Sequence, residues 1–402
     1  MAGEGRGHAS RVGSLVDALR DEYRFVLLAS DQAHQFLVER YGHASPGIRI
    51  EKIRGMRFLY TRGRLDLTRS VLAGLRFYQS LPAIRRQIEA LIDEERPALA
   101  VTDFEAALPR AAKRKGIPLV SIDHQHFTVA YDLSILPRGL RSYAGWIAYV
   151  TRLHHTHQVA TVVSGFFKPP LKKGYEDVVQ AGPFLRPELK VAQPTEGGFV
   201  LSYLRPFYPE RILAALRECG MPVRVYGLGE RPADGPLTFF PINEQTYIRD
   251  LAACHAYVGA GGNQTLGELV YLGKPVMPIP EPNHHEQLIN SHFIRHMGCG
   301  DFVTADRVTV ADIRKFLARR DEFLDGLAPL KGTLDGTEEA ANVIRKYASR
   351  GKGSGVFFGP TGAPMENTLT EKDSRPPGAS PPWLIDESEI RISKSETNSK
   401  QQ

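Results

Sequence analysis

The stretch VGAGGNQTLGELVYLGKPVMPIPEPNHHEQLIN, residues 258–290, decides the fold of this 402-residue chain. It opens with a short apolar strand that ends in Gly261-Gly262, and a polar turn then leads into an apolar helix pattern. That helix ends at Gly273, and a proline follows closely, which is a common way to stop a helix. A second strand, residues 276–279, runs into a proline-rich turn. Strand, helix and strand in this order predict a βαβ unit of a parallel sheet.

Polar residues follow both strands of this unit, at the edge where open α/β sheets bind ligands. Gly261 and Gly262 leave room for a ligand beside the backbone, and the free N–H groups of the next helix start suit a phosphate. An ordinary glycine-rich turn would explain this first loop equally well. The second polar cluster, His284–Gln287, lies about twenty residues later and is hard to explain by packing alone. Together the two loops favour a binding site for an anionic ligand.

The spacing G-G-x-x-T-x-x-E in residues 261–268, then G-x-P and the polar cluster, resembles the donor site of GT-B glycosyltransferases. It is most similar to the branch related to MurG and to family 28-like glycosyltransferases. The resemblance implies an α/β protein with two Rossmann-like domains facing each other across a cleft. It also implies a nucleotide-sugar donor, a UDP-sugar, as substrate, and no separate cofactor.

The donor-binding residues that the resemblance implies all lie in the second half of the chain. They are Arg205, Gly261, Gly262, Asn263, Gln264, Thr265, Glu268, His285, Glu286 and Gln287. Glu268 would accept hydrogen bonds from the ribose hydroxyls, while the glycines and Thr265 would hold the diphosphate. Glu286 and Gln287 would bind the sugar ring, because an acid and an amide suit hydroxyl groups. Arg205 is a candidate phosphate contact, with a plain surface arginine as the alternative.

Three histidines are candidates for the base that would deprotonate an acceptor hydroxyl. His8 lies at the end of a glycine-rich loop that opens a helix, and His124 and His126 follow the buried strand 117–122. Histidine suits the role because its side chain titrates near neutral pH. The alternatives are a structural or phosphate-binding histidine at residue 8 and hydrogen-bonded loop histidines at the other two positions.

The loop of His8 follows almost directly on residue 1. In GT-B relatives such a loop comes after the first strand, which is central in the N-terminal sheet. We therefore expect that strand to be missing here, through a late start site or a truncated gene. If the truncation is real, a degenerate protein that binds a nucleotide sugar without turnover becomes an alternative to an active enzyme.

Alternating strands and helices predict two domains with a connection and a tail. We expect an acceptor domain over residues 1–165, a connection over 166–196, a nucleotide-sugar domain over 197–347 and a disordered tail over 348–402. Within the first domain, residues 72–95 have a helical apolar pattern that Pro82 interrupts, which predicts a kink or two helices.

Composition narrows the remaining choices. The net charge of +6 is too diffuse to predict nucleic-acid binding, and three widely spaced cysteines give neither a disulfide framework nor a metal motif. We expect a cytoplasmic protein without a bound metal. The aromatic and basic segment 133–150 suggests contact with the inner face of a membrane, against the blander alternative of a core helix with exposed arginines.

The sequence thus predicts a GT-B glycosyltransferase that moves a hexose or N-acetylhexosamine from a UDP-sugar to a hydroxyl acceptor, with inversion. The acceptor, whose type is unknown, would be lipid-linked or part of a cell-envelope glycan. A UDP-sugar 2-epimerase-like enzyme is the alternative within the same fold, although we identify no additional catalytic acids for it.

Overall fold

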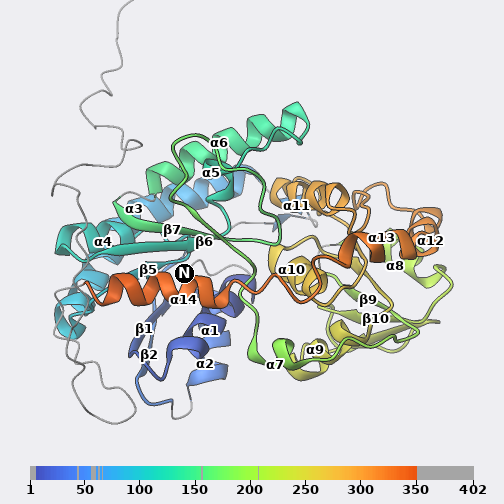
Figure 1. The fold of residues 1–402 in the computed structure, drawn as a ribbon, viewed down its shortest axis with the longest axis horizontal. Helices are drawn as coiled ribbons and strands as arrows, with labels where there is room; N and C mark the ends of the chain where they lie inside the picture. Colours follow the sequence, from blue (N-terminus) through green and yellow to red (C-terminus); the bar gives the residue numbers. More distant parts are fainter. Residues whose placement is uncertain are drawn as a thin grey trace, which may run out of the picture.

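The computed structural model describes residues 6–42, 45–55, 60–61, 64–65, 67–154, 157–206 and 208–350, and these form two α/β halves side by side (Figure 1). The first half contains, in chain order, α1 (Arg6–Leu19), β1 (Phe25–Ala29), α2 (Asp31–Tyr41), β2 (Ile48–Lys52), β3 (Tyr60–Thr61), β4 (Arg64–Leu65), α3 (Leu67–Glu95), β5 (Ala100–Thr102), α4 (Leu108–Lys115), β6 (Leu119–Asp123), α5 (Phe127–Ala130), α6 (Arg138–His154), β7 (Gln158–Ser164) and β8 (Val179–Ala181).

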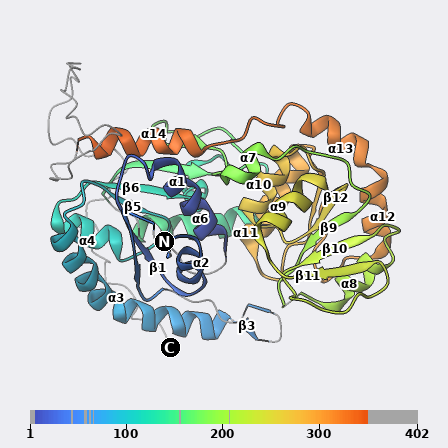
Figure 2. The same ribbon diagram turned by 90° about the horizontal axis from the view of Figure 1, so that it is seen from below.

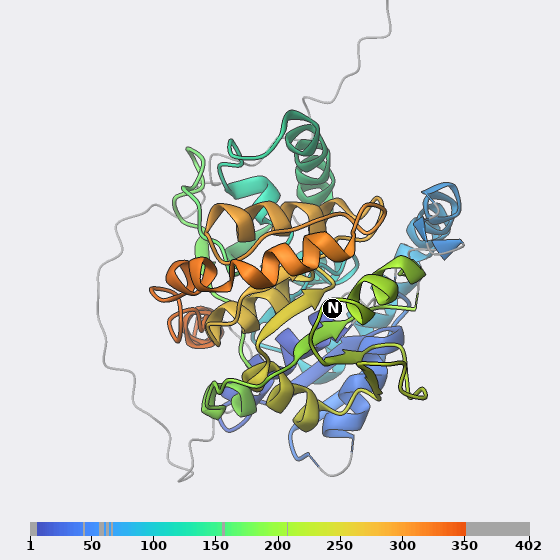
Figure 3. The ribbon, with the colours of Figure 1, turned by 90° about the vertical axis from the view of Figure 1, so that its right-hand side faces the viewer.

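The second half has an uninterrupted parallel sheet with strand order β11-β10-β9-β12-β13. In Figure 3 this half faces the viewer, and the orange helices lie together along one side of its strands. Its elements are α7 (Pro187–Val191), β9 (Val200–Tyr203), α8 (Glu210–Arg217), β10 (Val223–Tyr226), β11 (Leu237–Phe240), α9 (Glu244–Ala253), β12 (Ala256–Gly259), α10 (Asn263–Tyr271), β13 (Val276–Pro278), α11 (His285–His296), α12 (Val310–Ala318) and α13 (Arg320–Leu327). The βαβ unit predicted from residues 258–290 is β12-α10-β13.

The sheet of the first half is divided in two. Strands β1 and β2 pair with each other, and β5, β6, β7 and β8 form a separate four-stranded parallel sheet. The division falls between β1 and β5.

The last described helix, α14 (Thr337–Ala348), returns to the first half and crosses it (Figure 2). Ala340, Ala341 and Ile344 of α14 are buried in one apolar cluster with Leu15 of α1 and Val120 of β6. This helix, which the sequence placed in the predicted domain 197–347, therefore packs on the first half. The predicted connection also contains structure, because residues 166–196 include β8, the edge strand of the first half, and α7.

Helix α3 is continuous from Leu67 to Glu95 although Pro82 lies inside it, so the two-helix alternative is wrong. Apolar side chains on both sides of the proline, among them Phe77 and Ile88, are buried in one cluster. This burial outweighs the single backbone hydrogen bond that a proline removes from a helix.

Candidate active site

A cavity of about 470 Å³ lies between the two halves. On one side it is lined by the start of α1, the loops that follow β5 and β6, and one face of α6. On the other side it is lined by the loops that follow β9, β12 and β13. All of these loops come from the carboxyl ends of parallel strands, where such sheets bind ligands.

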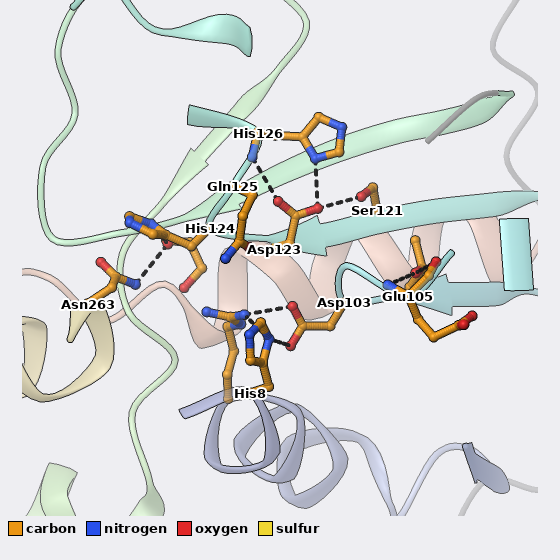
Figure 4. A network of polar contacts seen from close by, with 12 residues as sticks. His8, Asp103, Glu105, Ser121, Asp123, His124, Gln125, His126 and Asn263 are labelled. Carbon is orange, nitrogen blue, oxygen red and sulfur yellow. Dashed lines mark hydrogen bonds and ion pairs between the residues drawn. The ribbon is translucent and has the colours of Figure 1, made fainter. Parts of the chain in front are cut away.

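His8, in the first turn of α1, forms a dyad with Asp103, which directly follows β5 (Figure 4). Nδ1 of His8 lies 3.0 Å from Oδ2 of Asp103. The histidine lines the cavity and is partly exposed, whereas Asp103 is buried. A buried carboxylate in this position fixes the orientation of the imidazole ring and stabilises the imidazolium that forms when the ring takes up a proton.

Arg11, one turn further along α1, contacts both members of the dyad. Its Nη2 lies 2.6 Å from Oδ1 of Asp103 and 2.9 Å from Nδ1 of His8. In the neutral ring, Nδ1 either carries the proton and donates it to Asp103, or carries a lone pair and accepts a hydrogen bond from Arg11. A single tautomer cannot form both contacts. In the first arrangement Nε2 carries a lone pair and can act as a base, and in the second Nε2 carries the proton and cannot.

The charges around Asp103 keep it ionised. Burial acts to raise the pKa of its carboxyl, but the positive charge of Arg11 and the contact with His8 outweigh that effect and hold the pKa below its ordinary value. Asp103 therefore faces His8 as a carboxylate at neutral pH.

His124 also lines the cavity, but its ring is held by protein atoms at both nitrogens. Nδ1 lies 3.0 Å from the carbonyl oxygen of Ser164, and Nε2 lies 3.2 Å from Oδ1 of Asn290. Burial lowers the pKa of His124, and the ring packs against Phe127. These contacts connect the two halves and fit a structural histidine better than a base.

His126 turns away from the cavity (Figure 4). It is buried, and its Nδ1 lies 2.7 Å from Oδ2 of Asp123, which also accepts a hydrogen bond from Ser121. The backbone N–H of His126 donates to the other oxygen of Asp123. This second histidine–aspartate pair stabilises the turn after β6 on the side away from the cavity. The geometry therefore does not support His126 as the base.

The two glycines of the donor motif have different surroundings. A Cβ atom on Gly262, which caps α10, would enter open space, and Gly262 lines the cavity. A Cβ atom on Gly261 would come within 3.2 Å of the carbonyl oxygen of Gln287 and would press on α11. Gly262 therefore leaves room for a ligand, while Gly261 leaves room for the packing of α11.

The turn that begins α10 contains two buried amide oxygens without a protein partner among the described residues. They are Oδ1 of Asn263 and Oε1 of Gln264. The amide nitrogens of the same side chains are used, since Asn263 donates to the carbonyl of Ser164 and Gln264 donates to the carbonyl of Phe184. With Thr265, these residues line the cavity and present acceptors to it.

Glu268 is buried in α10 and forms a two-point ion pair with Arg186. Its carboxylate oxygens lie 3.1 and 2.7 Å from Nε and Nη2 of Arg186. Arg186 also contacts Glu244, which pairs at 3.0 Å with Arg40 of α2. A chain of charges thus joins the two halves beside the predicted ribose position, and a ribose hydroxyl would share the oxygens of Glu268 with Arg186.

The remaining predicted donor residues surround the far end of the cavity. Arg205 pairs with Glu281, and Gln287 contacts the same carboxylate through its side-chain amide. His285 stacks on Tyr143 of α6, with ring centroids 4.1 Å apart. Glu286 lies within 3.3 Å of Gln125, and although burial acts to raise its pKa, nearby His124 and other positive groups lower it.

Sequence reasoning missed the partners of these residues. Asp103 was visible only as an acid at the end of a buried strand, and nothing local joined it to His8. Arg11 and Arg186 gave no signal of their own. The carboxyl ends of neighbouring parallel strands meet at one edge of a sheet, so Asp103 and Asp123, at the ends of β5 and β6, could have been compared as partners of His8.

In the described part of the chain, no group of three or more His, Cys, Asp or Glu side chains could hold a metal ion. No helix in the same part is long and apolar enough to cross a membrane.

The sequence model of the glycosyl transferase family 1 matches residues 1–320. The chain belongs to this family. An uncharacterized glycosyltransferase of Methanosarcina acetivorans is 23% identical over 389 residues, which cover 86% of this chain and 97% of the relative. The family assignment makes the chain a glycosyltransferase, and the cavity between its halves is the candidate active site.

Solved glycosyltransferase structures share the fold. The glycotransferase of kitacinnamycin aligns with a TM-score of 0.61 at 17% identity, over 86% of this chain and 97% of that one. LpCGTa in complex with UDP aligns with a TM-score of 0.61 at 15% identity and the same coverage. The expected GT-B fold is confirmed, whereas the narrower likeness to MurG and family 28 is not shown by these matches.

Proposed function

We propose that this family 1 glycosyltransferase moves a hexose or N-acetylhexosamine from a UDP-sugar to a hydroxyl acceptor, with His8 as the base. The observation that carries the proposal is the placement of His8 and Asp103 opposite the start of α10 across one cavity. A base on one wall and a phosphate-binding helix start on the other are what a displacement at a sugar carbon requires.

In the proposed reaction, Nδ1–H of His8 donates to Asp103, and Nε2 removes the proton of the acceptor hydroxyl. The acceptor oxygen attacks the anomeric carbon, and the bond between that carbon and the diphosphate oxygen breaks with its electrons leaving on UDP. The proton stays on His8, where the Asp103 carboxylate stabilises the imidazolium. Attack opposite to the leaving group inverts the anomeric carbon.

The leaving diphosphate would lie at the amino-terminal end of α10. Gly262 leaves space there, and the first N–H groups of the helix point toward it with the positive end of the helix dipole. We therefore propose that peptide groups, rather than a metal ion, stabilise the charge that develops on the diphosphate. Glu268, shared with Arg186, would accept from the ribose, and Glu286 with Gln287 would bind the sugar.

Isothermal titration with UDP tests the donor site. We expect wild-type protein to bind UDP and Glu268→Gln to bind it about tenfold more weakly, because a neutral amide replaces a charged acceptor. Leu272→Met, at the C-cap of the same helix, is buried outside the cavity lining and is the matched control. Turnover is then measured as UDP release from UDP-glucose and UDP-N-acetylglucosamine. UDP binding without release from any donor would support the binding-only alternative, and no binding by folded protein would contradict a UDP-dependent function.

We also propose that the acceptor is presented at a membrane surface. Helix α6 lines the cavity with Tyr143, while Trp146, Tyr149 and Leu153 are 62%, 58% and 50% exposed along another face. Exposed Arg138, Arg141 and Arg152 lie on the same helix, and aromatic with basic side chains suit an anionic interface.

Sedimentation with vesicles tests this contact. Binding to phosphatidylglycerol vesicles should exceed binding to phosphatidylcholine vesicles, and Trp146→Ser/Tyr149→Ser should reduce it at least about fivefold. Val191→Ser, at an exposed apolar position on α7, is the control and should not change binding. Equal binding by wild type and the double variant would contradict membrane contact through α6.

A further inference from the structure

The carboxylate of Glu268, the proposed ribose acceptor, already accepts hydrogen bonds from the protein at most of its positions. Nε and Nη2 of Arg186 lie 3.1 and 2.7 Å from its Oε1 and Oε2. Nε2 of Gln264 lies 3.1 Å from Oε1 and also donates to it. An ionised carboxylate has about four lone-pair positions, two on each oxygen. Both positions on Oε1 and one on Oε2 are therefore used, and one position on Oε2 remains for a ligand.

The contact from Gln264 is fixed by a second acceptor. The amide nitrogen of Gln264 also lies 2.9 Å from the carbonyl oxygen of Phe184. Turning the amide over would place its oxygen against two acceptors, the Phe184 carbonyl and the Glu268 carboxylate. The amide nitrogen therefore stays on Glu268, and the position that it uses on Oε1 is not open to a ligand.

The exposure of Glu268 agrees with this count. The residue lines the cavity, but its side chain is 2% exposed. A carboxylate that binds both hydroxyls of a ribose at once must turn a free lone pair of each oxygen, or two of one oxygen, toward the ligand. Glu268 presents only a narrow edge of its carboxylate to the cavity, which leaves room for one hydroxyl.

Arg186 is held by a second carboxylate, which keeps it from moving aside to free another position on Glu268. The side chain of Arg186 is 10% exposed, and its Nη1 lies 3.4 Å from Oε1 of Glu244. The other oxygen of Glu244 lies 3.0 Å from Nη1 of Arg40, and Arg40 pairs at 2.6 Å with Asp17 of α1. Displacing Arg186 would leave buried charges unpaired, which costs more than one additional hydrogen bond to a hydroxyl contributes.

We infer that Arg186 is a specificity-determining residue that limits Glu268 to one hydroxyl of the pentose. The inference rests on the proposed function, in which the ribose of a UDP-sugar lies at Glu268. It widens the class of donor: the cleft accepts a nucleoside diphosphate sugar whose pentose lacks the hydroxyl that Glu268 does not bind, as well as one with a complete ribose. Without the two contacts from Arg186, the carboxylate would have positions for both hydroxyls and would select the complete ribose.

Isothermal titration of the wild-type protein with UDP, 2′-deoxy-UDP and 3′-deoxy-UDP tests the inference. We expect one deoxy analogue to bind at least about tenfold more weakly than UDP, because it loses a hydrogen bond to a charged acceptor. The other analogue should bind within about twofold of UDP, because the hydroxyl that it lacks has no acceptor on Glu268.

The same titrations separate the inference from the function on which it rests. Losses of about tenfold with both analogues would overturn the inference and leave a UDP-dependent function in place. Equal affinity for all three ligands would also overturn it, because Glu268 would then bind no pentose hydroxyl. No binding of UDP by folded protein would overturn the proposed function, and the inference with it.

Arg186→Lys distinguishes this role from a structural one. Lysine keeps the positive charge but donates through a single nitrogen, so it frees a position on Glu268. The analogue that binds wild type as well as UDP does should then bind at least about fivefold more weakly than UDP. Arg217→Lys is the matched control, because Arg217 makes a two-point contact with Asp234 outside the cavity lining, and it should keep the wild-type ratio.

The ratio of affinities, rather than the affinity for UDP, is the decisive quantity in this variant. A weaker affinity of Arg186→Lys for all three ligands with an unchanged ratio would mean a structural role and would overturn the inference. If Arg186→Lys does not fold, the wild-type titrations decide alone.

Discussion

The first half of the molecule contains two histidine–aspartate pairs at the ends of neighbouring strands, and they differ in what they face. His8 and Asp103 lie at the end of β5 with the imidazole lining the cleft, 3.0 Å from the carboxylate. His126 and Asp123 lie at the end of β6 with a shorter contact of 2.7 Å, but the pair is buried behind the turn. The tighter pair is the structural one.

The comparison shows that access, rather than the hydrogen bond itself, separates a base from a structural histidine. His126 and Asp123 are three residues apart and close their own turn, so the pair stabilises local structure. His8 lies on α1 and Asp103 follows β5, so the pair joins two separate elements, and Arg11 is added to it. A base needs a lone pair that reaches substrate, and of the histidines in these two pairs only His8 lines the cavity.

The largest difference should appear when each histidine is replaced. His8→Ala should lower the rate of sugar transfer by about 10²- to 10⁴-fold, because a positioned general base contributes on that order. His126→Ala should lower it less than about tenfold while decreasing the melting temperature, since it removes a buried hydrogen bond. Steady-state rates and UDP titrations on both variants check this. A larger loss of transfer in His126→Ala than in His8→Ala, with both folded, would reverse the assignment.

Gly261 and Gly262 show the same contrast on the donor side, because one is packed against α11 and the other lines the cavity. Gly262→Ala places a methyl group in the cavity and should weaken UDP binding about tenfold with little change in melting temperature. Gly261→Ala presses on the backbone of α11 and should mainly destabilise the fold by about 1–3 kcal/mol. Titration and thermal unfolding of both variants separate the effects. Unchanged UDP affinity in Gly262→Ala would remove the diphosphate from the start of α10.

The smallest expected effect concerns the dependence of stability on pH. The folded-state pKa of Asp103 lies below its ordinary value of 3.8, so its ionised form stabilises the fold above that pH. As the pH falls through the folded-state pKa this contribution is lost. Urea unfolding should therefore show a gap between wild type and Asp103→Asn that is full at pH 6 and shrinks below about pH 4. A gap that stays constant down to pH 2.5 would mean that the charge of Asp103 does not contribute.

The sequence was sufficient for the donor loop because its parts are contiguous. Gly262, Thr265 and Glu268 lie within two turns of one helix, so a short motif predicted both the fold and the wall of the cleft. Contacts between residues far apart in the chain could not be predicted from the sequence. Asp103 is 95 residues from His8, and Arg186 is 82 residues from Glu268, so only the folded chain brings them together.

The sequence also could not show which of the three candidate histidines is the base, because that depends on where each imidazole ring points in the folded chain. His124 and His126 are two residues apart on one turn, yet one ring faces Asn290 of the other half and the other turns back to Asp123. Pro82 shows the same limit for secondary structure. A local rule predicted a kink or two helices at Pro82, and α3 is one helix with buried apolar residues on both sides of the proline.

The most direct measurement is the tautomer of His8, read from long-range ¹H–¹⁵N NMR correlations of the imidazole nitrogens with His8→Gln for assignment. The account predicts that the neutral ring carries its proton on Nδ1, facing Asp103, and has a free lone pair on Nε2. A proton on Nε2, with Arg11 donating to Nδ1, would contradict it, because the ring would then have no lone pair to offer to an acceptor hydroxyl.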